Sequence, residues 1–276
     1  WNCIAKIDPA SAPGGVVAYS SGNHAQGVAA AAKLRGFPAL IVMPADTPEI
    51  KKANTLGHGA EIVTYDRKTE NREEIAGRIA SERRATLVPP FEHPDVISGQ
   101  GTVGLELARQ AASLGLVLDD VLVNCSGGGL TAGIALAMER LSPRSVVHTV
   151  EPEGFDDHAR SLISGRRESN TQSGGSICDA LMSARPGEMT FAINQPRLGP
   201  GLVVSEEEVC EAMRFAFETL KLVLEPGGAA ALAAVLAGKI ETRGRVVGVI
   251  ASGGNVDPDL FCRIVSRRPP VRSATG

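Results

Sequence analysis

The sequence has no long apolar run and no excess of positive charge. Its longest apolar stretch, Ala229 to Ala237, falls well short of the roughly 20 residues that a membrane-spanning helix requires. The formal net charge of the 276 residues is −3. A chain without a basic excess lacks the field that attracts nucleic-acid phosphates or anionic lipid. We therefore expect neither a nucleic acid nor a membrane as a partner.

Cysteine is scarce and scattered. The five cysteines form no Cys-x-x-Cys pair and have no histidine nearby at a spacing that suits zinc. An odd number of dispersed cysteines is typical of reduced thiols rather than of a disulfide framework. The sequence thus predicts a cytoplasmic protein without a zinc site.

Short β-branched runs alternate with alanine- and leucine-rich segments along most of the chain. "GVVAYS", "ALIVM" and "AEIVTY" are each followed by a helical pattern, and "DVLVNC", "SVVHTV" and "RVVGVI" form a second series. This alternation predicts an α/β fold whose mostly parallel strands are buried by crossover helices. We expect two such open, twisted-sheet domains, a small one over 15–92 and a large one over 93–276, preceded by a linker over 1–14.

The sequence also predicts where two helices begin and where a third one lies. Ser205 and Glu208 have the spacing of a capping box, in which each side chain satisfies a free backbone N–H of the first turn. This box predicts a long helix through about Lys221. Residues 104–112 predict another helix, and Ser21 or Asn23 could cap a helix that starts near Ala25.

Three apolar strands run into turns of small residues. These turns are "SSGNH" at 20–24, "SGGGL" at 126–130 and "SGGN" at 252–255. In parallel sheets, ligands bind outside the carboxyl ends of the strands. We therefore expect the three turns to converge on one ligand site.

The middle turn has more than one interpretation. A glycine run before a helix lets backbone N–H groups cradle a phosphate at the positive end of the helix. Gly127, Gly129 and Ala132 also match the loose dinucleotide fingerprint, with Glu151 about 20 residues further on. A nicotinamide-dependent oxidoreductase is therefore an alternative, as is a tight strand-to-helix turn without a ligand.

Taken together, the motifs resemble those of one family. The chain is similar to the serine/threonine dehydratases of the type II fold of pyridoxal phosphate enzymes, which include serine racemases and 3-hydroxyaspartate dehydratases. The resemblance covers nearly the whole chain and implies the tryptophan synthase β-like fold. It rests on six segments in order: "SSGNHAQGVA", "VMPADTPEIKKANTLGHGAEIV", "ISGQGTVGLEL", "SGGGL", "LEPGGAAALAA" and "SGGNVD".

The resemblance implies a role in pyridoxal phosphate binding for each turn. Asn23 would hydrogen-bond the hydroxyl of the cofactor ring, and Ser252 would face the pyridine nitrogen. A serine hydroxyl is far too weak an acid to keep that nitrogen protonated, so the ring would be a milder electron sink than one paired with a carboxylate. The phosphate would be held by Ser126, Gly127, Gly128, Gly129 and Leu130.

The resemblance also implies residues that act on an amino acid substrate. Ser21 matches a catalytic serine on the cofactor face opposite the Schiff-base lysine, where a racemase has its second acid/base. Ser20, His24 and Arg72 match positions near the substrate carboxylate, to which an arginine can form a bidentate pair. For Arg72, a solvated helix position beside two glutamates is the alternative.

A metal site is implied by the segment "TVEPEGFDD". In some family members the matching residues bind a hard divalent cation. Glu151 and Asp157 would supply carboxylate oxygens and Phe155 a backbone carbonyl, a set that suits Mg²⁺ or Ca²⁺. An acidic, solvated loop after a strand is the alternative.

The family's Schiff-base lysine has no counterpart in the sequence. None of the seven lysines lies in the Ser-Phe-Lys-x-Arg-Gly-Ala context of the family. Trp1 and Asn2 resemble the residues that follow this context, so we expect the catalytic lysine to precede Trp1. A non-catalytic binder is the alternative.

The sequence as a whole predicts a pyridoxal-phosphate-dependent ammonia-lyase. The expected substrate is threonine or serine, which would be converted to a 2-oxo acid and ammonia. A 3-hydroxyaspartate dehydratase and a serine racemase are alternatives within the family. We expect the enzyme to be a homodimer.

Overall fold

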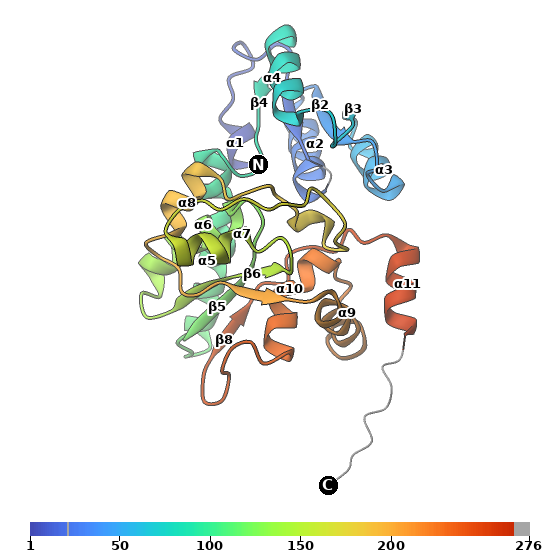
Figure 1. Ribbon diagram of the computed structural model, residues 1–276. Helices are drawn as coiled ribbons and strands as arrows, with labels where there is room; N and C mark the ends of the chain where they lie inside the picture. The colour runs from blue at the N-terminus through green and yellow to red at the C-terminus, as the bar shows by residue number, and fades with distance from the viewer. Residues whose placement is uncertain (21, 268–276) are drawn as a thin grey trace.

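The computed structural model describes residues 1–20 and 22–267, and it contains two parallel β-sheets. In Figure 1 the first sheet and its helices lie above the second. The two sheets have the strand orders β3-β2-β1-β4 and β7-β6-β5-β8, and every pair of neighbouring strands is parallel. The prediction of two mostly parallel α/β sheets is confirmed.

The first sheet is covered on both faces because side chains alternate along its strands. In β1, one of the two inner strands, Val16 and Ala18 pack against one helix, whereas Val17 and Tyr19 pack against another on the opposite face. These helices are α2 and α4. The elements of this half are α1 (Asn2–Ala5), β1 (Val16–Tyr19), α2 (Asn23–Arg35), β2 (Ala39–Pro44), α3 (Glu49–Gly57), β3 (Glu61–Tyr65), α4 (Arg72–Arg83) and β4 (Thr86–Leu87).

The second sheet is built in the same way. Val121 and Val123 of its strand β5 pack against α5 and α6, and Leu122 between them faces α9 and α10. The elements of this half are α5 (Pro94–Ser113), β5 (Asp120–Asn124), α6 (Gly129–Leu141), β6 (Val146–Pro152), α7 (Asp157–Ser164), η1 (Asp179–Leu181), α8 (Glu188–Asn194), β7 (Leu202–Val204), α9 (Glu206–Phe215), the π-helix η2 (Ala216–Leu220), α10 (Pro226–Leu236), β8 (Val247–Val249) and α11 (Pro258–Ser266).

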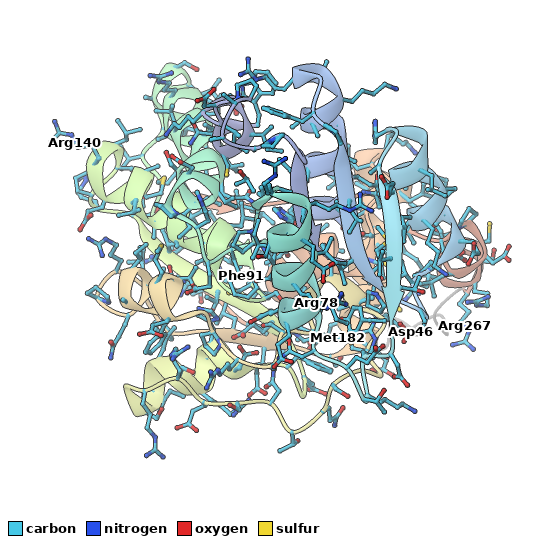
Figure 2. All side chains as sticks on the ribbon, turned by 90° about the horizontal axis from the view of Figure 1, so that it is seen from above. Asp46, Arg78, Phe91, Arg140, Met182 and Arg267 are labelled. Carbon is cyan, nitrogen blue, oxygen red and sulfur yellow. The ribbon has the colours of Figure 1, made fainter. Side chains whose placement is uncertain are left out.

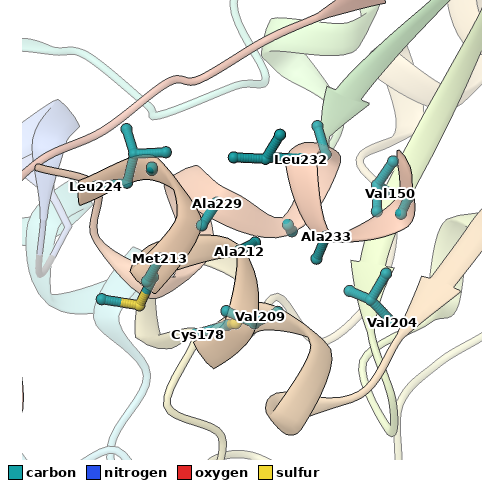
Figure 3. Close-up of a cluster of buried hydrophobic side chains, with 14 of the residues drawn as sticks. Val150, Cys178, Val204, Val209, Ala212, Met213, Leu224, Ala229, Leu232 and Ala233 are labelled. Atoms are coloured by element: carbon teal, nitrogen blue, oxygen red, sulfur yellow. The ribbon is translucent and has the colours of Figure 1, made fainter. Parts of the chain in front are cut away.

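Helix α10 forms the centre of the larger core. Its alanines are fully buried between α9 and the sheet, as Ala229 and Ala233 show in Figure 3. Small side chains allow the helix backbone to approach both neighbours closely. This packing places Glu225, the N-cap residue of α10, at the carboxyl edge of the second sheet.

Two helices differ from their predicted bounds. α5 begins at Pro94, well before the predicted start at residue 104, because His93 caps it by accepting the backbone N–H of Asp95 at 3.1 Å. The capping box of Ser205 and Glu208 is present at the start of α9. This helix continues to Leu220 only as a π-helix, and Lys221 ends it with φ of +60°.

The predicted domain boundary at residues 92 and 93 lies between β4 and α5. The predicted linker over 1–14 contains α1, which packs against α2 and α5. No described helix combines the length and the apolar character that crossing a membrane would require.

Candidate active site

The three predicted turns line one cavity at the facing carboxyl edges of the two sheets. The cavity has a volume of about 270 Å³ and includes residues from all three turns. Of the predicted site residues, its lining contains Ser20, Asn23, His24, Arg72, Ser126, Gly127, Gly128, Gly129, Leu130 and Ser252. Ser21 lies outside the described residues. The roles of these residues stay predictions, but the structure places them together.

The glycine loop is a backbone surface with no space for side chains. A Cβ atom on Gly127 would lie 2.2 Å from the ring of Phe91, and one on Gly128 would lie 2.6 Å from the ring of His158. Gly128 also has φ of +92°, in the left-handed region that favours glycine. The loop therefore exposes N–H groups rather than side chains.

The loop leads directly into α6, whose N-terminus has no side-chain cap among the described residues. The first N–H groups of an α-helix have no partner within the helix, and the helix dipole favours an anion there. Together with the glycine loop, this N-terminus fits the phosphate of pyridoxal phosphate.

Ser252 is held by Asn124, the last residue of β5. The Asn124 amide donates to Ser252 Oγ at 3.0 Å and to the Ile250 carbonyl at 2.8 Å. Its Oδ1 accepts the N–H of Ala231 in α10 at 2.6 Å. Because Ser252 Oγ already accepts one hydrogen bond, its own O–H is left to donate to an unprotonated ring nitrogen.

Asn23 does not cap α2, although its position would have allowed it. It is the first residue of the helix, and its amide donates to Glu225 while its oxygen accepts from the Asn255 amide. An amide group has two N–H donors, so one remains for a ring hydroxyl. The structure thus connects Asn23 of the first half to two residues of the second.

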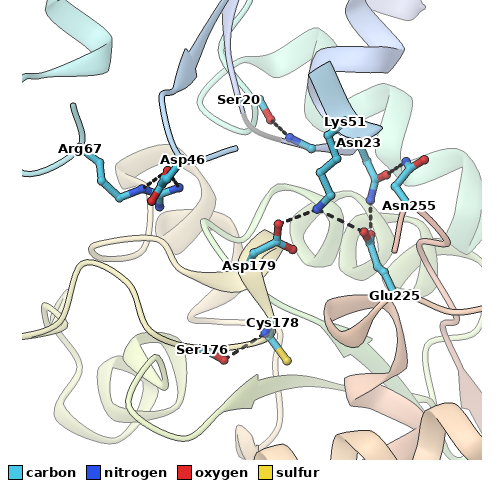
Figure 4. A network of polar contacts seen from close by, with 11 residues as sticks. Ser20, Asn23, Asp46, Lys51, Arg67, Ser176, Cys178, Asp179, Glu225 and Asn255 are labelled. Carbon is cyan, nitrogen blue, oxygen red and sulfur yellow. Dashed lines mark hydrogen bonds and ion pairs between the residues drawn. The ribbon is translucent and has the colours of Figure 1, made fainter. Parts of the chain in front are cut away.

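The carboxylate that holds Asn23 belongs to a buried network (Figure 4). Lys51 Nζ of α3 lies 2.6 Å from Asp179 Oδ2 and 3.7 Å from Glu225 Oε2. Burial raises the pKa of Glu225, and the nearby Lys51 ammonium and the Asn23 amide oppose this effect. The network fixes α3 and α2 of the first half against η1 and α10 of the second.

The substrate side of the cavity consists of side chains from the first half. His24 Nε2 donates to the Val88 carbonyl at 3.0 Å. Burial lowers the pKa of His24 to about 4, so this ring is neutral at pH 7. The Arg72 guanidinium lies over the ring of Tyr19, 5.3 Å from its centroid, and the residue is half-buried.

The predicted metal ligands lie behind the glycine loop and not in the cavity lining. Glu151 accepts the N–H groups of His158 and Ala159 at 2.8 and 2.7 Å, one with each carboxylate oxygen. Asp157 accepts the Asn170 amide at 2.6 Å with Oδ1, and only its Oδ2 is without a partner among the described atoms. Both oxygens of Glu151 and one of Asp157 are therefore engaged within the protein. The side chains as arranged do not make a complete cation site, and the metal, with Phe155 as its third ligand, stays a prediction.

Sequence reasoning missed several residues of the cavity and its support. The cavity is also lined by Asn124, Phe91, Arg67 and Glu225, which lie outside the predicted site residues. For Asn124 there was a signal, because an amide at the end of an otherwise apolar buried strand needs partners in the interior. Among the described lining residues there is no lysine.

A glycine loop at a helix N-terminus, opposite a serine hydroxyl and an asparagine amide, defines a site for a phosphorylated pyridine cofactor. The comparisons with known proteins identify the class. The model of the pyridoxal-phosphate dependent enzyme family matches residues 1–253, and the chain belongs to this family. The nicotinamide alternative is left without support.

The similar proteins act on different amino acids. The L-threo-3-hydroxyaspartate ammonia-lyase of Saccharomyces cerevisiae is 42% identical over 96% of this chain and 80% of its own length. The serine racemase of Schizosaccharomyces pombe is 36% identical over 96% of this chain and 81% of its own length. Among solved structures, maize serine racemase aligns with a TM-score of 0.87 and 38% identity over 95% of this chain and 79% of that one. The T.th. threonine deaminase aligns with a TM-score of 0.86 and 43% identity, over 93% of this chain and 81% of that one.

Proposed function

We propose that the protein is an ammonia-lyase that converts a small β-hydroxy amino acid to a 2-oxo acid and ammonia. The convergence of the three turns on one cavity carries this proposal, since it supplies a phosphate cradle, a ring-nitrogen partner and a polar substrate end together. Threonine and serine are the substrates that the sequence predicts. The relatives support 3-hydroxyaspartate equally well.

Pyridoxal phosphate, when bound, withdraws electrons from the α-carbon of an amino acid. The glycine loop and the N-terminus of α6 would hold its phosphate. Ser252 would donate a hydrogen bond to the ring nitrogen without protonating it, which favours loss of a β-substituent over a long-lived carbanion. The neutral amide of Asn23 would donate its remaining N–H to the ring hydroxyl and so orient the ring.

The first half of the molecule would bind and orient the substrate. Ser20 Oγ accepts the N–H of Gly22 at 3.2 Å, which shapes the turn before α2. The α-carboxylate would lie near this turn, His24 and Arg72. Because His24 is neutral, Arg72 would supply the positive charge there. Ser21 is proposed as the acid/base on the face opposite the lysine.

The test is release of 2-oxo acid and ammonia by the protein in the form in which cells make it, loaded with pyridoxal phosphate. L-threonine, L-serine and L-threo-3-hydroxyaspartate would each be offered. We expect equal amounts of the two products from at least one of them. A protein that binds the cofactor but releases neither product from any of the three would contradict the proposal.

Racemisation is the second candidate, supported by the similarity to serine racemases. It is distinguished by D-serine that accumulates from L-serine. If D-serine forms faster than pyruvate, racemisation and not elimination is the main activity.

A further inference from the structure

The cavity has two cationic side chains at its substrate end. Arg67 and Arg72 are the arginines of its described lining. Arg67 lies between β3 and α4, and Arg72 is the first residue of α4. The anionic side chains of the lining, Asp179 and Glu225, belong to the other half of the molecule and interact with Lys51. The positive charge of the two arginines is therefore not balanced by these carboxylates.

Arg67 is held in place from outside the cavity. Its Nε and Nη2 both donate to Oδ1 of Asp46, at 3.0 and 2.9 Å, and Figure 4 shows this pair apart from the Lys51 network. The Asp46 side chain is 65% exposed, whereas that of Arg67 is 24% exposed. The aspartate thus orients the guanidinium, and Nη1 of Arg67 has no partner among the described residues.

Unlike Arg67, Arg72 has no acidic partner in the described structure. Its guanidinium lies over Tyr19, whose phenol stays neutral because burial raises its pKa to about 12. A neutral ring attracts a cation but does not cancel its charge. Two oriented guanidinium groups in a partly desolvated cavity can bind one planar anion together or one planar anion each.

Serine and threonine have only one carboxylate for two arginines. Their β-substituents are a hydroxyl group and, in threonine, a methyl group, and neither pairs with a guanidinium ion. A β-hydroxy amino acid with a second carboxylate would pair with both arginines. This step rests on the proposed lyase function. We propose that Arg72 binds the α-carboxylate and that Arg67 binds a distal carboxylate. Arg67 is then a specificity-determining residue that favours a substrate of the 3-hydroxyaspartate type.

The test is calorimetric binding of two unreactive four-carbon probes to the protein loaded with pyridoxal phosphate. Succinate has two carboxylates and butyrate has one. We expect succinate to bind more tightly than butyrate. Arg67→Gln should lower the succinate affinity by about tenfold or more, as expected for loss of a charged hydrogen bond, and leave butyrate unchanged.

The matched control is Arg78→Gln on α4. Arg78 is 62% exposed and pairs with Glu82 on the outer surface of the helix (Figure 2). This variant should bind both probes as the wild type does. A thermal melt of each variant would establish that the fold is intact.

Two results would overturn the inference. One is equal affinity of the wild type for succinate and butyrate, and the other is an Arg67→Gln variant that keeps the succinate affinity. Because neither probe can undergo elimination, these results do not depend on lyase activity. A protein that prefers succinate but releases no 2-oxo acid from any amino acid would contradict only the proposed function.

Discussion

The cavity has two sides that are built from different parts of the chain. The phosphate side is made of backbone, since Gly127, Gly128 and Gly129 leave no space for a Cβ atom. The substrate side is made of long or polar side chains, such as those of His24 in α2 and Arg72 in α4, from the other half of the molecule.

Because of this difference, we expect the two sides to tolerate different amino-acid substitutions. A backbone surface works only with one conformation, so almost any side chain would block it. A side-chain surface can exchange one polar group for another and so change the substrate while the cofactor site stays the same. We expect changes on the phosphate side to abolish function and changes on the substrate side to redirect it.

The largest effect is expected from Gly128→Ala. The new Cβ would contact His158 and the residue would keep a left-handed φ, so we expect a loss of about 2 to 5 kcal/mol in the free energy of unfolding. The displaced N–H groups should also lower the affinity for pyridoxal phosphate by about 100-fold. Chemical denaturation and cofactor titration measure the two effects.

The control for this change is Gly77→Ala in the middle of α4. A Cβ atom there meets no other atom within 4 Å. This variant should gain about 0.5 to 1 kcal/mol, because alanine is the better helix former. If both variants bind the cofactor equally well, the phosphate side does not depend on its backbone conformation.

The phosphate side could be predicted from the sequence because its determinants are local. Ser126 to Leu130 follow one strand and start one helix, and glycine is the residue that such a turn requires. The same holds for the capping box of Ser205 and Glu208. The family resemblance added the roles of residues whose types alone were ambiguous, such as Asn23.

The support of the substrate side could not be predicted because it depends on long-range contacts. Lys51 meets Asp179 across 128 residues of sequence and Glu225 across still more, and no local pattern marks such a pair. α5 shows the same limit. The glycines of α5 disfavour a helix. Gly101 is nevertheless required, because a Cβ atom there would lie 2.9 Å from the Gly133 carbonyl oxygen of α6.

The second prediction tests the network of Lys51, Asp179 and Glu225, which holds the substrate side against the other half. Lys51→Met removes the cation from a buried network and leaves Asp179 and Glu225 facing each other. Because Asp179 is partly exposed and burial already favours protonated Glu225, we expect a loss of about 2 to 4 kcal/mol. Denaturation at pH 7 measures the loss.

The neighbouring Lys52 provides the matched control. Lys52 pairs with the exposed Glu49 one turn earlier in the same helix. The Lys52 ammonium also donates to the Ala45 carbonyl at 3.1 Å, so Lys52→Met should cost about 1 kcal/mol, less than Lys51→Met. Equal effects of the two substitutions would mean that the interdomain network does not stabilise the substrate side.

The smallest expected effect concerns the pH dependence that His24 gives to the substrate side. Its pKa of about 4 in the folded state lies below the value of about 6.5 for an unfolded chain. Between these values the unfolded state binds more protons, so stability should fall as the pH is lowered from 6.5 to 4.

His24→Gln keeps a donor for the Val88 carbonyl but cannot be protonated. It should therefore reduce this fall by about 1 to 3 kcal/mol, measured by denaturation at several pH values. Some fall should remain, because burial also lowers the pKa of His158 to about 4, and this ring packs against Gly128 on the phosphate side. A variant with the full pH dependence of the wild type would show that His24 does not contribute to it. The difference between the variant and the wild type is therefore the contribution of His24 on the substrate side.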